Sequence, residues 1–233
     1  MMNLAEYRRT ASRLADYLPW VALVGFGVVL NKDGSFQRTA KFRGPDLDSA
    51  VAAELVAVAG RLNNAFRRLG SGWAIFVEAQ RSEAATYPAS RFPDPASALV
   101  DAERKADFEE KGSHFVSGYF LTFLWLPPAE DAARSESWLY EGRETSSVNP
   151  WELVRGFADR TDRVLALLDG FMPECRWLDD AGTLTYLHST ISINRHRVRV
   201  PETPTYLDAL LADQPLTGGL EPRLGNQHLR AVS

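Results

Sequence analysis

The sequence contains a single cysteine, Cys175, among its 233 residues. One thiol excludes an intrachain disulfide and a metal site built from several cysteines. Histidine is also scarce, and the two that lie nearest each other, His188 and His196, are eight residues apart. That spacing matches neither the i, i+4 pair of a zinc protease helix nor the tight pair of a zinc finger. We therefore expect no metal site, and we interpret these residues as structural or surface side chains.

Lysine is scarce as well, and none of the lysines stands where a phosphate-binding loop needs one. Such a loop requires Gly-x4-Gly-Lys-Ser/Thr, in which glycine backbone N–H groups cradle the phosphates and the lysine neutralises them. Lys32, Lys41, Lys105 and Lys111 neither follow a glycine nor precede a serine or threonine. The chain alone is not expected to hydrolyse a nucleotide.

Patterns for nucleophilic catalysis are missing too. No Gly-x-Ser-x-Gly elbow occurs, and Glu174 places a carboxylate beside Cys175, where a thiolate would be disfavoured. The sequence predicts no catalytic residue and no cofactor in this chain. A small enzyme with an unrecognised site stays open as an alternative.

No long hydrophobic run is present. The longest candidate, Leu18 to Leu30, holds Pro19 and two glycines and is shorter than the roughly 20 residues that a membrane-spanning helix needs. It is more typical of a strand. The net charge of −4 gives no general attraction to nucleic acid or anionic lipid, and 45% hydrophobic and 24% charged residues are ordinary for a soluble globular protein.

What the sequence does contain is an alternation of strand and helix patterns. Asp33-Gly34 favours a tight turn between strands in 18–30 and 35–43. Apolar residues three and four apart predict a helix over 51–69, which Asp46 or Ser49 can cap. The other expected elements are strands at 73–80 and 114–126 and helices at 95–111, 150–170, 183–192 and 206–211. The apolar run of strand 114–126 is typical of a strand buried on both faces.

These patterns predict an α+β fold, with a mixed, largely antiparallel sheet and helices packed against it. We expect an N-terminal arm at 1–17 and an α+β domain at 18–233, with a possible sub-boundary in the charged segment near 129–148.

Two sets of residues are candidates for binding rather than catalysis. The arm is amphipathic and rich in arginine, which indicates a short surface helix or, alternatively, a segment that docks onto a membrane-embedded partner or lipid headgroups. Its candidate contacts are Tyr7, Arg8, Arg9, Arg13, Tyr17 and Trp20. If the later segment is extended, Arg195, Arg197 and Arg199 share one side, where they could contact nucleic acid or another subunit.

Four stretches carry a resemblance to a known family, in order along the chain. They are NLAEYRRTASRLADYLPW (3–20), VVLNKDGSFQRTAKFRGPDL (28–47), RLNNAFRRLGSGWAIFVEAQR (61–81) and YFLTFLWLPP (119–128). They resemble the amino-terminal region of the conjugal-transfer ATPases of the VirB/TrbE/CagE type IV secretion family. The resemblance implies that the motor, with its ATP and Mg, lies in a C-terminal domain downstream.

The resemblance implies a non-catalytic docking and oligomerisation domain of an ATPase that powers DNA transfer and pilus assembly. It also implies a cytoplasmic location, peripheral to the inner membrane of a Gram-negative bacterium. The expected partners are inner-membrane components of the secretion system and further copies of the full-length protein, with nucleic acid contact left open. A free-standing adaptor or regulatory protein of the same system is the alternative.

Overall fold

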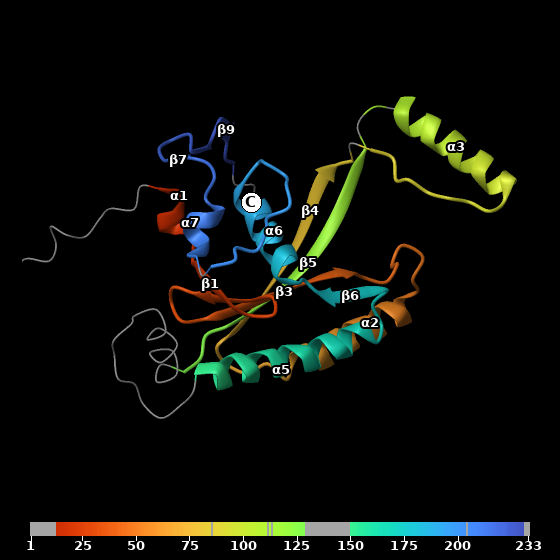
Figure 1. Ribbon diagram of the computed structural model, residues 1–233. Helices are drawn as coiled ribbons and strands as arrows, with labels where there is room; N and C mark the ends of the chain where they lie inside the picture. Colours follow the sequence, from red (N-terminus) through yellow and green to blue (C-terminus); the bar gives the residue numbers. More distant parts are fainter. Residues whose placement is uncertain are drawn as a thin grey trace, which may run out of the picture.

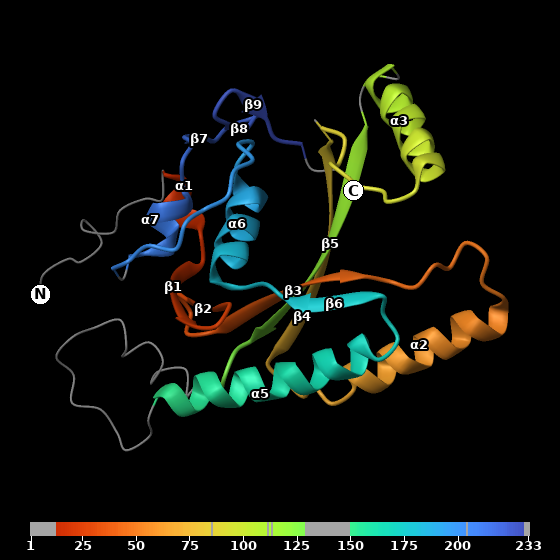
Figure 2. The ribbon, with the colours of Figure 1, turned by 45° about the vertical axis from the view of Figure 1, so that its right-hand side comes forward.

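The computed structural model describes residues 13–84, 86–110, 112, 114–128, 150–203 and 205–230. Within these residues, helices cover both faces of the main sheet (Figures 1 and 2). The elements are α1 Leu14–Tyr17, β1 Trp20–Gly25, β2 Val28–Asn31, β3 Phe36–Arg43, α2 Ala52–Phe66, β4 Trp73–Glu83, α3 Pro95–Glu110, β5 Phe115–Trp125, α5 Pro150–Asp169, β6 Glu174–Trp177, α6 Asp180–Ile191, α7 Leu207–Leu211, β7 Leu216–Thr217, β8 Arg223–Leu224 and β9 Gln227–His228.

The main sheet has the strand order β1-β2-β3-β5-β4, and β6 pairs with the second half of β3. Every pairing in it is antiparallel. The short strands β7, β8 and β9 form a second sheet. The predicted α+β class with a largely antiparallel sheet is therefore confirmed.

The predicted first strand is in fact two strands. The turn at Asn31 to Gly34 forms as expected, with Gly34 at a φ of 79°. A second turn at Phe26-Gly27 folds β1 back on β2, and Gly27 has a φ of 64°. Its N–H donates to an Asp180 carboxylate oxygen at 2.7 Å. A continuous apolar run does not reveal such a turn, because both strands that flank it are hydrophobic, with β2 buried throughout and β1 buried or half-buried.

Two hydrophobic cores lie on opposite faces of the sheet. On one face α2 and α5 lie side by side (Figure 2) and pack on residues such as Leu121 and Phe123. Next to this core, Phe36, Trp73, Trp125 and Phe157 form an aromatic cluster with ring centroids 5.6–6.3 Å apart. On the other face, α1, α6 and α7 build a core with members of β1 and β2; its buried residues include Leu14, Trp20, Val29, Leu184, Leu187, Leu207 and Leu211.

The structure corrects the expected packing of the helix at 51–69. Neither Asp46 nor Ser49 caps it; its N-cap is Val51, whose N–H donates to the Glu54 carboxylate at 3.0 Å. Only the C-terminal half of α2 packs on the sheet. In the N-terminal half, Val51, Leu55 and Val56 are 61%, 43% and 72% exposed. We call this exposed half, Val51 to Val56, the α2 apolar face.

The ladder of β4 and β5 is longer than the sequence indicates and is covered over only some of its length. It pairs Trp73 with Trp125 at one end and Glu83 with Phe115 at the other. The apolar run that led to the expectation of burial begins at Phe120, and from there to Trp125 the strand is buried or half-buried. Before this run, Phe115 and Val116 are 52% and 56% exposed.

Helix α3 begins after Asp94, as predicted, and the Asp94 carboxylate accepts from the N–H of Ser97 at 2.9 Å. No residue of α3 is buried. The helix lies beyond the far end of the β4–β5 ladder, away from the two cores (Figures 1 and 2).

In the C-terminal region the structure corrects the start of one expected helix and adds two short strands. Helix α6 begins at Asp180 rather than Thr183, because the Asp179 carboxylate caps it by accepting from the N–H of Gly182 at 2.6 Å. The chain after Gly218 forms β8 and β9 of the small sheet. Among the described residues, no helix combines the length and the hydropathy that crossing a membrane would require.

Candidate functional site

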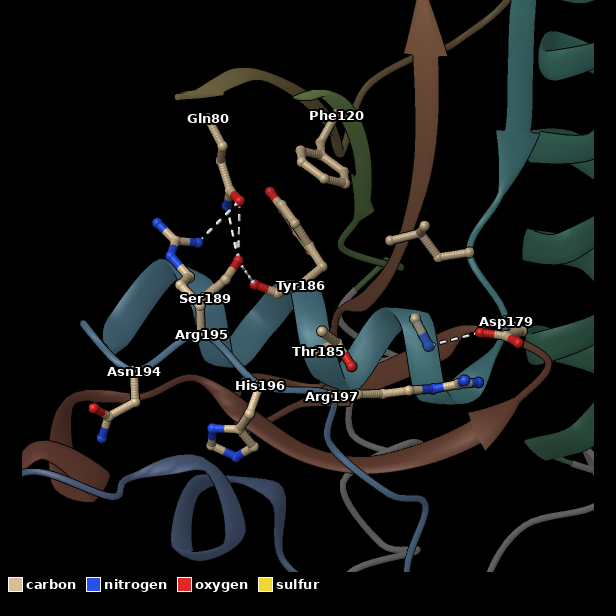
Figure 3. A pocket seen from close by; sticks show the side chains of 12 residues that line it. Gln80, Phe120, Asp179, Thr185, Tyr186, Ser189, Asn194, Arg195, His196 and Arg197 are labelled. Atoms are coloured by element: carbon tan, nitrogen blue, oxygen red, sulfur yellow. Dashed lines mark hydrogen bonds between the residues drawn. The ribbon is translucent and has the colours of Figure 1, made fainter. Parts of the chain in front are cut away.

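Two grooves and one exposed helix face are the candidate binding sites among the described residues. The first groove, which we call the α6 groove, has a volume of about 570 Å³ and lies between α6, the β4–β5 ladder and the extended segment after α6 (Figure 3). It is lined by Gln80, Phe120, Leu178, Asp179, Gly182, Thr185, Tyr186, Ser189, Asn194, Arg195, His196 and Arg197.

Hydrogen bonds hold the middle of the α6 groove. The Gln80 amide nitrogen donates to the Ser189 hydroxyl at 2.9 Å, and the Arg195 guanidinium donates to the Gln80 carbonyl oxygen at 3.3 Å (Figure 3). The Tyr186 hydroxyl donates to the Glu78 carboxylate at 2.7 Å. These bonds fix β4 to α6 and orient one guanidinium at the groove.

The Tyr186 phenol is a neutral hydrogen-bond donor. Burial raises its pKa well above the ordinary value, and the bond to Glu78 and the charge of that carboxylate act in the same direction, against a bond with Thr122. Its ring lies 4.6 Å from that of Phe120, which supplies an apolar wall. The groove therefore suits a ligand with an apolar body and an anionic group, rather than a reaction that needs a phenolate.

Cys175 is not an activated nucleophile. The thiol is buried, and burial, followed by the charge of Asp169, raises its pKa to about 11. The thiolate fraction at neutral pH is thus very small.

The structure brings His188 and His196 together although they are eight residues apart. Their ring centroids are 4.4 Å apart, and His188 Nε2 lies 3.1 Å from the Asp213 carboxylate. That carboxylate also accepts from Ser192 and Asn194, each at 3.0 Å. Among the residues that the structure describes, no group of three or more His, Cys, Asp or Glu side chains could hold a metal ion.

The candidate residues of the arm and of the extended segment differ in how far they are exposed. Trp20 is only 7% exposed and belongs to the core of α6 and α7, so in this fold it presents little surface to a partner. Arg13 and Tyr17 are exposed at α1, and Tyr7, Arg8 and Arg9 lie outside the described residues. All three predicted arginines of the later segment are exposed; Arg195 and Arg197 line the α6 groove, whereas Arg199 does not.

The second groove was not predicted. It has a volume of about 550 Å³, and it is lined by Arg68, Leu69, Gly70, Ser71, Trp73, Trp125, Pro128, Leu153, Arg160, Arg163 and Val164. We call it the arginine groove. The spacing of Arg160 and Arg163 on α5 puts both on one helix face, but Arg68 joins them only through the packing of α2 beside α5.

Comparison with known proteins gives the family. The model of the type IV secretion system ATPase VirB4/TrbE, N-terminal domain, matches residues 27–133. A relative from Sinorhizobium fredii, described as the first portion of a probable conjugal transfer protein TrbE, is 39% identical over 130 residues, which cover 54% of this chain and 87% of that protein. The chain belongs to the VirB4/TrbE family.

A second relative in the VirB4/TrbE family is much longer. "Conjugal transfer protein TrbE" from Rhizobium radiobacter is 32% identical over 250 residues, which cover all of this chain and 30% of that protein. The chain thus corresponds to less than a third of that relative. The family resemblance inferred from the sequence is confirmed, and it is to the N-terminal domain.

The family match does not cover the candidate sites evenly. Residues 27–133 include the α2 apolar face, α3 and the whole β4–β5 ladder. The arginines of α5 and the α6 groove's Arg195 and Arg197 lie beyond the matched range.

Proposed function

We propose that this chain is the non-catalytic docking and oligomerisation domain of a conjugative type IV secretion ATPase, at the cytoplasmic face of the inner membrane. Membership of the VirB4/TrbE family supports the secretion system. In this proposal, nucleotide chemistry belongs to a separate motor domain. The partner is an inner-membrane component of that system.

The α2 apolar face is the observation that carries the docking role. The first nine residues of α2, AAELVAVAG, hold Glu54 as their one charged side chain. Large apolar side chains are exposed here, since Leu47, four residues before Val51 in the sequence, is 44% exposed in addition to Val51, Leu55 and Val56. An exposed apolar patch of this kind is typical of a protein–protein contact, and it fits an apolar helix of a membrane component.

The test is made with the full-length ATPase in a donor bacterium, using the double substitution Leu55→Asp/Val56→Asp. Burying each of these side chains in an interface contributes roughly 1.5–3 kcal/mol, and about 1.4 kcal/mol corresponds to tenfold in affinity. We expect recovery of the protein with membranes, and conjugative transfer, to fall at least about tenfold.

The control is Leu220→Asp, because Leu220 is fully exposed in another region of the chain. The control is expected to leave both readouts unchanged. Unchanged membrane recovery and transfer in the double variant, at normal protein level, would exclude docking through this face. ATP hydrolysis by the purified chain would instead favour the enzyme alternative.

A free-standing adaptor of the secretion system is the second candidate. The Sinorhizobium relative favours it, since an alignment of 130 residues spans 87% of that protein, which is therefore short. Function of this chain supplied separately from a motor domain would distinguish the adaptor from the docking domain.

A further inference from the structure

The arginine groove has a positive rim and an aromatic floor. Among the described residues, none that lines it is acidic, and no carboxylate lies within ion-pair distance of Arg68, Arg160 or Arg163. The Arg160 guanidinium lies 5.0 Å from the centre of the Trp125 ring, and Trp73 stacks on Trp125 with centroids 5.9 Å apart. Three guanidiniums without an acidic partner among the described residues, in a chain of net charge −4, favour a ligand with several carboxylates or phosphates.

Helix α3 has the complementary charge. Its sixteen residues, PASALVDAERKADFEE, carry five acidic and two basic side chains, a net charge of −3. Leu99, Glu103 and Glu110 are four and seven residues apart, so they lie on one face of the helix. Leu99 is 64% exposed, and neither Glu103 nor Glu110 is paired with a described cation.

Short contacts fix α3 to the segments that flank it. The Tyr87 hydroxyl donates to the Asp101 carboxylate at 2.7 Å, and the Phe108 ring stacks on His114 with centroids 4.0 Å apart. The helix is thus a defined element with an apolar and acidic outer surface, yet none of its residues is buried in this chain.

The helix and the groove lie at opposite ends of the β4–β5 ladder. Trp73 is at the groove, and Glu83, ten residues along β4, is at the α3 end, about 33 Å away at 3.3 Å per residue. The chain from Glu110 to Phe115 reaches at most about 18 Å, so the carboxylates near the end of α3 cannot reach the groove of their own chain. A contact between the two must join different molecules.

We infer that α3 of one copy docks in the arginine groove of a second copy, with Glu103 and Glu110 against the arginines and Leu99 toward the indole floor. Two different surfaces meet in such a head-to-tail contact, and repetition of it produces a ring or a filament rather than a closed dimer. The inference rests on the proposed function, and it names the two surfaces through which copies of the chain would oligomerise. A single helix in a groove of this size makes a small interface, so the pairwise affinity is low and falls with added salt.

The experiment uses charge reversal on each side of the contact. The groove variant is Arg160→Glu/Arg163→Glu, and the helix variant is Glu103→Lys/Glu110→Lys. Sedimentation velocity at low salt is expected to show concentration-dependent association of the unmodified chain and monomers for each variant alone. An equal mixture of the two variants should associate again, because every contact between unlike molecules then joins opposite charges.

The matched control is Arg155→Glu/Arg230→Glu, which changes the net charge equally at exposed arginines that neither line the groove nor belong to a candidate contact set. This control should associate as the unmodified chain does. An unmodified chain that stays monomeric into the millimolar range, or variants that do not rescue each other, would overturn the inference. The inference would also be overturned if the groove variant lost binding to a labelled single-stranded oligonucleotide but still self-associated. In each case membrane docking through α2 could still hold, because it is measured separately.

Discussion

Replacement of Phe157 by alanine should cost this protein a large share of its stability. Phe157 is fully buried in α5, and its ring lies 5.8 Å from Phe36, 5.6 Å from Trp73 and 6.3 Å from Trp125. Phe→Ala in a core costs about 3–5 kcal/mol because it leaves a cavity, and a domain is stable by about 5–15 kcal/mol. For a domain of this size, each kcal/mol lowers Tm by about 2–4 °C, so a fall of about 6–20 °C follows.

Urea denaturation followed by circular dichroism measures the change in the free energy of unfolding. Trp151→Ala is the control in the same helix, since Trp151 is 52% exposed, and its cost should stay within about 1 kcal/mol. A Phe157→Ala variant no less stable than Trp151→Ala would refute the assignment of this aromatic cluster as the link between α5 and the sheet.

Three further predictions concern single residues. Gly27→Ala should destabilise the protein by more than about 1 kcal/mol in the same urea assay, because the positive φ is unfavourable for alanine and the new Cβ would lie 2.5 Å from the carbonyl oxygen of Leu178. Cys175 should resist a thiol reagent at pH 8 until urea unfolds the chain; rapid labelling of folded protein would contradict the burial that raises its pKa to about 11. Burial alone would raise the pKa of Asp213, but the hydrogen bonds it accepts outweigh burial and lower the pKa, so its contribution to stability is present above about pH 4 and is lost as the pH falls through the lowered value. Asp213→Asn should therefore reduce the acid sensitivity of unfolding, and an unchanged pH profile would refute this.

Local signals in the sequence predict the elements well where they involve neighbouring residues. Asp94 caps α3 and the Asp33-Gly34 turn forms, because a cap and a tight turn depend on residues two or three apart. The turn at Gly27 was missed, because the features that hold it, Asp180 and the carbonyl of Leu178, are more than 150 residues away along the chain.

Candidate sites were harder to predict than elements. Of the three arginines that the sequence groups by alternation, Arg195 and Arg197 line the α6 groove and Arg199 does not. The arginine groove needs α2, α5 and the ends of β4 and β5 together, and no spacing in the sequence indicates that Arg68 approaches Arg160. Periodicity predicted the stripe of α2, but only the tertiary structure shows that Leu55 is left exposed.

The pairing of β3 has a consequence for the integrity of the chain. β3 pairs with β5 along one edge. Along its other edge, the first part of β3 pairs with β2 and the second part pairs with β6. β5 precedes the segment between Pro128 and Pro150 and β6 follows it, so a break of the covalent chain there would leave two fragments joined by main-chain hydrogen bonds and by the packing of α5 on α2. The two fragments could therefore be made as separate polypeptides and reassemble by fragment complementation.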